Sequence, residues 1–419
     1  MQSSRCLRFL LLCWACILLL ARVYGQPAGD ARTIALVGAK IYPSPTAPAI
    51  EHGVVLIRAG KIVAVGSNKT ITVSKNDSVI DCRGLTLAAA FWNCHVHFIE
   101  PKWQGADTMD VNRFDRQMSD MITSHGFAHV FDIAELHISN VLRIRNRIKH
   151  GDVHGPIIYT TGVPLVPPNG NPVYLEPLKL PAATDSQTVV THIRQQIDSG
   201  ADGIKIWTGS PTQHGVVHMA DNMVRMITNI AHSQGKPVFA HPSDSKGVMV
   251  AVDNGVDIVA HTTPDDRLLW SADMIGKMLR AHVAVIPTLK LWKDVLIQAG
   301  DTAWSHDKFI FTAEQQLHDF DKAGGTILFG TDVGYITDYA TGDEFALLAA
   351  SGLTWSRILG ILTTAPAERF GLKKRTGQIV VGLDADIVLL QGDPAADVQA
   401  FDKVELTILH GKVIYKRSQ

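Results

Sequence analysis

The central part of the sequence, from residue 88 to residue 370, alternates short apolar runs with longer stretches whose apolar residues recur at helical spacing. Short apolar runs without a helical period are typical of buried strands, and the stretches between them predict amphipathic helices. Eight strands are predicted. The first consists of the apolar run at residues 85–90 and the stretch 91–98 at its end, and the others lie at residues 127–132, 156–161, 203–207, 237–241, 258–261, 284–288 and 326–331. Eight strands that alternate with helices predict an α/β fold in which residues 88–370 form a (β/α)8 TIM barrel.

Both ends of the chain show a different pattern, in which β-rich runs are joined by tight turns. These runs lie at residues 33–39, 53–58, 61–65, 377–390 and 404–415. Ala59-Gly60, between the second and third runs, is a hairpin signal. The N-terminal region alone is too small for a sandwich with two packed sheets. We therefore expect residues 26–87 and 371–419 to pair into one small β-sandwich domain.

The first 25 residues have the pattern of a signal peptide. Arg5 and Arg8 precede an apolar run at residues 9–20, which is too short to span a bilayer comfortably. Val23-Tyr24-Gly25 resembles a cleavage site with small residues at the two key positions. This predicts a secreted or periplasmic protein without a stable membrane anchor after cleavage; the alternative is an uncleaved anchor.

Composition narrows the function classes. The chain has 419 residues, of which 46% are hydrophobic, and a formal net charge of −1. No basic run or face indicates binding to nucleic acid. Beyond the predicted signal peptide only Cys82 and Cys94 remain, so buried free thiols are favoured over a disulfide framework. The oligomeric state is open, a homo-oligomer included.

Candidate chemistry lies where the predicted barrel strands end. Active sites of such barrels form at the C-terminal ends of the strands. Two histidines one residue apart on a strand face the same way and can chelate one metal ion. Any one of the histidines alone is better explained as a hydrogen-bonded core residue. The set at the strand ends, however, comprises His95, His97, Lys205, His241, His261 and Asp332.

Lys205 is the most diagnostic residue of this set. It lies in the apolar run at residues 203–207, and burial lowers the pKa of an amine. A neutral amine can add carbon dioxide to form a carbamate, whose two oxygens can bridge two metal ions. The alternative for Lys205 is an ion pair with a carboxylate of the barrel. Six such side chains together predict a site for two divalent ions; zinc fits the donor types, as would manganese or cobalt.

With these motifs in place, the sequence resembles the amidohydrolase superfamily, nearest to its imidazolonepropionase- and prolidase-like branch. The resemblance also includes Thr364-Ala-Pro-Ala-Glu-Arg-Phe370 and the ending Gly-Leu-Asp-Ala-Asp-Ile-Val at residues 382–388. It implies that His95, His97 and Asp332 bind an inner metal ion and that His241 and His261 bind an outer one. It further implies that carboxylated Lys205 bridges the two ions together with a hydroxide.

The sequence departs from the family pattern at three places. Ala89-Ala90-Phe91-Trp92 replaces the usual Pro-Gly, and Asn93-Cys94 replaces the usual Asp before the histidine pair. Pro167-Pro-Asn-Gly-Asn-Pro172 stands where some relatives have Gly-Gly-His. None of these changes removes a metal ligand. They leave the subgroup and the substrate open.

The predicted function is that of an exported binuclear amidohydrolase. Its bridging hydroxide would attack an amide bond of a dipeptide such as Xaa-Pro or of an N-acyl amino acid, and Asp332 would pass the proton to the leaving amine. The alternatives are a lactone, ester or phosphotriester hydrolase on the same site, a mononuclear cyclic-amidine hydrolase or deaminase, and a catalytically inactive scaffold. Tyr335, His214 and His218 are weak candidates for substrate contacts.

Overall fold

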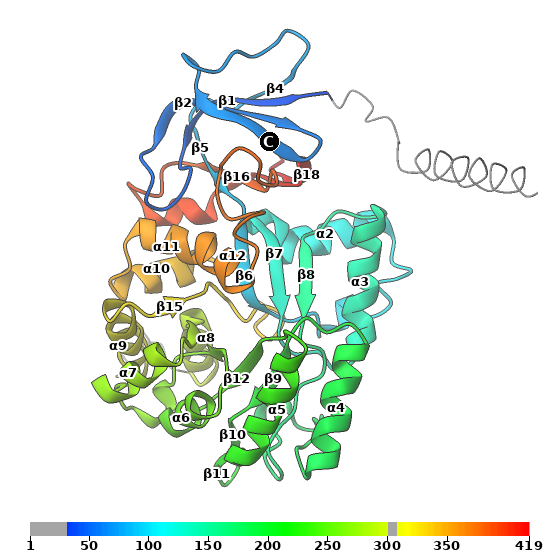
Figure 1. Ribbon diagram of the computed structural model, residues 1–419, viewed down its shortest axis with the longest axis vertical. Coiled ribbons are helices and arrows are strands. Elements are labelled where there is room, and N and C mark those ends of the chain that lie inside the picture. Colours follow the sequence, from blue (N-terminus) through cyan, green and yellow to red (C-terminus); the bar gives the residue numbers. More distant parts are fainter. Residues whose placement is uncertain (1–31, 301–307, 419) are drawn as a thin grey trace, which may run out of the picture.

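The computed structural model describes residues 32–300 and 308–418 (Figure 1). The predicted signal peptide, residues 1–25, lies outside the described residues. Within the described ranges, none of the helices combines the length and the apolar character needed to cross a bilayer.

Both ends of the chain contribute to one sheet of eight strands. Its path runs β18-β17-β16-β5-β1-β2-β3, and β4 pairs with β1 off this path. β5 and β16 pair antiparallel with Ala89 opposite Ile387, which joins the two ends of the chain (blue and red in Figure 1). The strands are β1 (Ile34–Ile41), β2 (Ile50–Arg58), β3 (Lys61–Ser67), β4 (Ser78–Asp81), β5 (Leu85–Ala89), β16 (Ile387–Gln391), β17 (Val404–Leu409) and β18 (Lys412–Lys416). The arrangement as a sandwich stays a prediction.

The central region contains two parallel sheets. One has the order β6-β7-β8 and the other the order β15-β14-β13-β12-β9. Their strands are β6 (Phe91–Val96), β7 (Phe127–Asp132), β8 (Ile157–Thr160), β9 (Ile204–Trp207), β12 (Val238–His241), β13 (Ile258–Ala260), β14 (Ala284–Ile286) and β15 (Thr326–Ile327). They fall in the eight strands predicted from the sequence, although β15 is shorter than predicted. The prediction for the first strand was wrong in part, because its apolar residues 85–89 form the separate strand β5 of the terminal sheet. A hairpin of β10 (Gly209–Thr212) and β11 (Gly215–His218) follows β9.

Backbone contacts beyond the regular strands link the edges of these two sheets. The chain after β8 reaches β9, because Leu165 and Ile206 form an isolated parallel bridge. The chain after β15 reaches β6 in the same way, through a bridge between Val96 and Val333. At that second edge the backbone N–H of Cys94 donates to the carbonyl of Phe329 at 2.8 Å. These contacts bring the edges of the two sheets close together.

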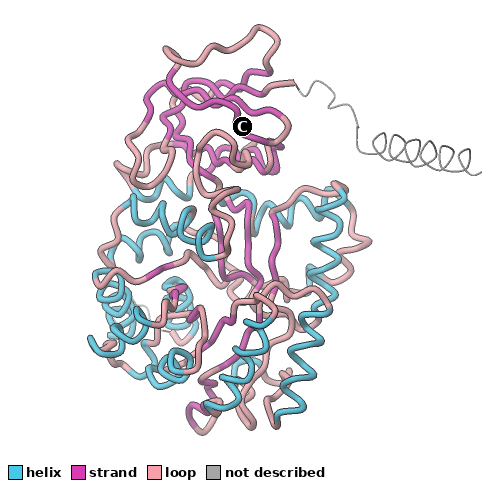
Figure 2. The backbone as a smooth tube through the Cα atoms, viewed as in Figure 1, coloured by secondary structure: helices cyan, strands magenta, loops and turns pink. Residues whose placement is uncertain are grey.

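Helices lie outside the central strands (cyan around magenta in Figure 2). The helix α3 buries Val141 and Ile144 on one face, as an amphipathic helix does. Several helices begin at a side-chain cap, such as Asp185, which accepts from the backbone N–H of Thr188 at 2.8 Å. The helices are α2 (Val111–Met121), α3 (Ile138–His150), α4 (Ser186–Asp198), α5 (Asp221–Ser233), α6 (Ser245–Asp253), α7 (Ala272–Arg280), α8 (Leu289–Gln298), α9 (Lys308–Lys322), α10 (Gly342–Ala350), α11 (Trp355–Leu362) and α12 (Thr364–Arg369).

A compact apolar cluster supports the central strands. Its fully buried members include Trp92, Phe131, Phe239, Ile258 and Leu328, contributed by five different strands or strand extensions. The polar residues singled out from the sequence follow farther along several of these strands. Cys82 and Cys94 are buried and free, as predicted, and burial raises the pKa of the Cys82 thiol to about 11.

Candidate metal centre

Three polar side chains converge at the end of β6. His95 lies in this strand and His97 one residue beyond it, and their Nε2 atoms are 3.2 Å apart. Asp332 reaches them from the loop after β15, with Oδ1 3.2 Å from Nε2 of His95 and 2.8 Å from Nε2 of His97. Atoms that each lie about 2.0–2.2 Å from one zinc ion are roughly 3.4 Å apart at a tetrahedral angle. The spacing of these three atoms therefore suits ligands of one ion.

Two glycines let the loop of Asp332 approach β6. The backbone N–H of Asp332 donates to the carbonyl of His95 at 2.8 Å. A Cβ atom at Gly330 would lie 2.8 Å from Cβ of His95, and one at Gly334 would lie 1.8 Å from the carbonyl oxygen of His97. Gly334 also has a φ of +99°, which L side chains rarely adopt. Close packing therefore requires glycine at positions 330 and 334, in addition to the role of Asp332 as a candidate metal ligand.

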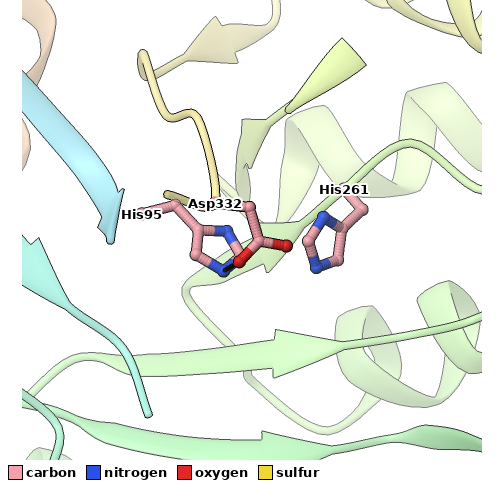
Figure 3. Close-up of side chains that lie close together, drawn as sticks. All are labelled: His95, His261 and Asp332. Atoms are coloured by element: carbon pink, nitrogen blue, oxygen red, sulfur yellow. Dashed lines mark ion pairs between the residues drawn. The ribbon is translucent and has the colours of Figure 1, made fainter. Parts of the chain in front are cut away.

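His241 and His261 end the neighbouring strands β12 and β13. Their ring centroids are 4.8 Å apart, and the His261 ring is also 4.8 Å from that of His95. Ligand atoms of His95, His261 and Asp332 all lie within 4.8 Å of one another (Figure 3). His261 and Asp332 both have positive φ angles, of 79° and 61°. Strained backbone of this kind is concentrated at functional sites.

Hydrogen bonds at Nδ1 orient the rings of His97 and His261 and leave Nε2 of each ring unprotonated. Nδ1 of His97 lies 3.0 Å from the carbonyl oxygen of Ala134, which can only accept. The Thr288 hydroxyl donates to the Pro287 carbonyl, so its oxygen accepts from Nδ1 of His261 at 2.6 Å. With Nδ1 protonated, Nε2 of a neutral imidazole is an acceptor. Lone pairs and a carboxylate that face one another in this way fit a bound cation.

Burial sets the protonation states that metal binding requires. Burial lowers the pKa of His95 to about 4 and holds those of His241 and His261 well below the usual value for histidine. Burial alone would raise the pKa of Asp332, but the adjacent His95 and His97 hold it well below its usual range. Neutral imidazoles and an ionised carboxylate are the forms that bind metal ions.

Lys205 lies in β9 and is almost completely buried. Burial lowers the pKa of its amine to about 7. Its Nζ lies 5.1 Å from the centre of the Trp207 ring. Within residues 32–300 and 308–418, Lys205 forms no ion pair, so the structure does not support the alternative of an ion pair with a barrel carboxylate. A substantial neutral fraction near pH 7 makes this amine nucleophilic.

A cavity of about 250 Å³ opens beside these six residues, all of which line it. Tyr335 lines it too, as expected of a candidate for substrate contacts. The other two candidates lie elsewhere. His214 lines a separate surface depression, and Nε2 of His218 lies 2.9 Å from Asp244, at the start of α6.

Several residues that line the cavity were not expected from the sequence. Among the described residues they include Glu135, Tyr174, Trp207, Asp265 and Trp292. Burial, followed by the charge of nearby Asp132, raises the pKa of Glu135 to about 10. Glu135 comes shortly after the strand run at residues 127–132, so the rule that identified the metal-ligand candidates would also have found it.

A family model described as the amidohydrolase family matches residues 86–414, which is most of the chain. Ochratoxinase of Aspergillus niger is 23% identical over 401 residues, covering 83% of this chain and 79% of that protein. The crystal structure of a candidate prolidase from Bifidobacterium longum matches with a TM-score of 0.78 and 22% identity, covering 93% of this chain and 96% of that one.

A third relative is a Xaa-Pro dipeptidase with methionine bound in its active site. Its crystal structure matches with a TM-score of 0.78 and 18% identity, covering 92% of this chain and 100% of that one. At these identities the structural matches show the fold. They confirm the predicted α/β class, which is that of TIM-barrel amidohydrolases.

Proposed function

Because the chain belongs to the amidohydrolase family, and is therefore a hydrolase that acts on carbon–nitrogen bonds, we propose that it cleaves amide bonds with the help of two divalent metal ions. The observation that carries this proposal is the convergence of the six candidate ligand side chains on one cavity. We also propose that the two central sheets close into one (β/α)8 barrel, since backbone bridges link their edges.

In this proposal the six side chains divide into three groups. His95, His97 and Asp332 hold one ion, as their mutual distances of 2.8–3.2 Å suggest. His241 and His261 hold the other. Lys205 would contribute to both sites as a carbamate, which forms when a neutral amine attacks the carbon of carbon dioxide and loses one proton. Zinc fits the nitrogen and oxygen donors of this set.

Two ions bound here would make hydroxide available near neutral pH and polarise the carbonyl of the substrate. The remaining chemistry belongs to the chain. Asp332 accepts the proton of the attacking water and passes it to the leaving nitrogen, because its carboxylate lies beside the metal-binding histidines. Water is consumed, the C–N bond breaks, and a carboxylic acid and an amine are released.

Metal analysis of the protein purified with bicarbonate tests the proposal. We expect about two ions per chain, as in other two-metal hydrolases. Lys205→Ala should lose metal and activity, whereas Lys246→Ala, on the exposed face of α6, should change neither. One ion or none in the wild type, unaltered by Lys205→Ala, contradicts the two-metal site.

We propose dipeptides such as Xaa-Pro and N-acyl amino acids as the substrate classes to test first. Ochratoxinase and a Xaa-Pro dipeptidase are among the relatives that support this choice. We also propose that the protein is exported, on the basis of residues 1–25. N-terminal sequencing of the secreted protein should find a mature chain that begins after about Gly25; retention of residues 1–25 contradicts export with cleavage.

A further inference from the structure

The described walls of the cavity lack the positive charges that would bind a free carboxylate. Carboxylates of ligands are usually bound by arginine or lysine side chains. Among the described side chains that line this cavity there is no arginine, and the sole lysine is Lys205 of the metal centre. The acidic residues that line it, apart from Asp332, are Glu135 and Asp265. The cavity therefore favours a substrate with a hydrogen-bond donor or a positive charge.

Glu135 offers an unused acceptor. It is 2% exposed, and its Oε1 atom is buried without a hydrogen-bond partner among the described residues. An unpaired polar atom costs free energy in the free protein, which a ligand N–H can recover. Since Glu135 lines the cavity, such a ligand would be the substrate.

Asp265 offers a second carboxylate, from another side of the cavity. It belongs to the short 3-10 helix η4 (Pro264–Asp266), which follows β13, whereas Glu135 follows β7. Its neighbour Asp266 accepts backbone N–H groups of Ser245 and Leu268 at 2.7 and 3.1 Å. Asp265 makes no side-chain hydrogen bond or ion pair with a described residue. The residue as a whole is exposed, while partial burial of its carboxyl raises the pKa of that group to about 6. The Asp265 carboxylate is therefore available to form an ion pair with a positively charged group of the substrate.

The rest of the wall is apolar and aromatic. Tyr174, Trp207, Leu291 and Trp292 line the cavity. Tyr174 and Tyr335 keep 41% and 38% of their surface exposed, with ring centroids 5.5 Å apart, so apolar surface continues to the solvent-accessible part of the cavity. Walls of this kind bind apolar or aromatic groups, and the few polar side chains fix the orientation.

We propose, building on the amide-hydrolase function above, that the substrate is an amide with an apolar or aromatic group and an ammonium group, but no carboxylate beside the scissile bond. Asp265 acts as a specificity-determining residue for the ammonium group. This departs from the two substrate classes proposed above for the first tests, because dipeptides and N-acyl amino acids carry a carboxylate that no described cation of the wall would bind.

Three matched substrates test the proposal on the zinc-loaded full chain. Phenylalanyl-pyrrolidide carries the ammonium group alone, phenylalanyl-proline adds a carboxylate, and N-acetylphenylalanyl-pyrrolidide lacks both charges. We expect kcat/KM for phenylalanyl-pyrrolidide to exceed the other two by about tenfold or more, the size of one charge-assisted hydrogen bond. Equal or faster cleavage of phenylalanyl-proline overturns the proposal while leaving the amide-hydrolase function intact.

A variant pair assigns the effect to Asp265. Asp265→Asn should lower kcat/KM for phenylalanyl-pyrrolidide by about tenfold and leave the acetylated substrate unaffected. Asp273→Asn, an exposed change on α7, should leave both unaffected. An equal loss for both substrates in Asp265→Asn would show a structural role and overturn the assignment.

Absence of any amide cleavage would contradict the amide-hydrolase function. Binding measured by calorimetry would still test the proposed preference for an ammonium group in that case. Wild-type protein should bind 2-phenylethylamine more tightly than 2-phenylethanol, which has the same ring without the charge. Asp265→Asn should remove this preference. Equal affinity of the wild type for both compounds overturns the inference independently of any turnover.

Discussion

The side-chain amide of Asn93 donates a hydrogen bond to Oγ1 of Thr331 at 2.7 Å, between residues 238 positions apart in the sequence. The amide oxygen of Asn93 accepts from the backbone N–H of His95 at 3.2 Å. One buried side chain therefore ties β6 to the loop that carries Asp332. The asparagine that replaces the usual aspartate before the histidine pair uses both its donor and its acceptor here.

Replacing Asn93 should loosen this connection. Asn93→Ala leaves the Thr331 hydroxyl and the His95 N–H without these partners, at a cost of about 1–3 kcal/mol in the free energy of unfolding. Metal affinity should fall roughly 10–100-fold, as for other residues that orient ligands. Urea unfolding and zinc titration measure the two effects. Asn222→Ala, exposed on α5, is the control, and unchanged zinc affinity in Asn93→Ala would refute the positioning role.

A methyl group at Gly334 should displace the loop of Asp332. Gly334→Ala places a Cβ 1.8 Å from the carbonyl oxygen of His97, whereas Gly324→Ala meets no atom within 4 Å. Both glycines have positive φ, of +99° and +85°, so the pair separates the clash from the backbone strain that both share. We expect Gly324→Ala to cost about 1 kcal/mol and Gly334→Ala clearly more, with loss of zinc binding. Equal effects in urea unfolding and zinc titration would contradict a role for the close approach.

The strand-end residues could be predicted because strands obey a simple rule. A buried parallel strand reads as an apolar run, and the first polar residue after it lies at the edge where other strands also end. His241, His261 and Asp332 each follow such a run. Lys205 is an exception to this rule, because it lies within its strand. A lysine inside an apolar run is unusual, and its expected burial was the reason to consider it as a candidate ligand.

The cavity wall could not be predicted in the same way. Tyr174 and Asp265 lie in short 3-10 helices, and Trp292 faces the cavity from α8. The positions of such loops depend on tertiary contacts that no periodicity records. His218 shows that position in the sequence can also mislead. It comes after β9 in the sequence, but its side chain contacts Asp244, and neither residue lines the cavity.

The stability of the metal-free protein should depend on pH through His95. Burial lowers the pKa of His95 from 6.5 to about 4, so the unfolded chain binds more protons than the folded chain between these values. This contribution to stability is present above pH 6.5 and is lost as pH falls toward 4. The loss is on the order of 3 kcal/mol, at about 1.4 kcal/mol for each pKa unit.

Chemical unfolding of the metal-free protein between pH 4 and 7 measures this dependence. His95→Gln should flatten the slope by about one proton, and His150→Gln, exposed at the end of α3, should leave it unchanged. A slope that His95→Gln does not alter would refute the assignment to His95.

Asp332 should be needed for turnover more than for substrate binding. Asp332→Asn keeps an oxygen that can face a metal ion but removes the basic carboxylate, so kcat should fall by about 100-fold to 10,000-fold while KM changes little. Oδ1 of Asp332 lies 2.8 Å from Nε2 of His97, so this carboxylate is a candidate both for a metal ligand and for the proton acceptor. Zinc content, measured in parallel, distinguishes the loss of one role from the loss of the other. The control is Asp273→Asn, and a variant that retains zinc and most of the kcat of the wild type would show that Asp332 does not transfer the proton.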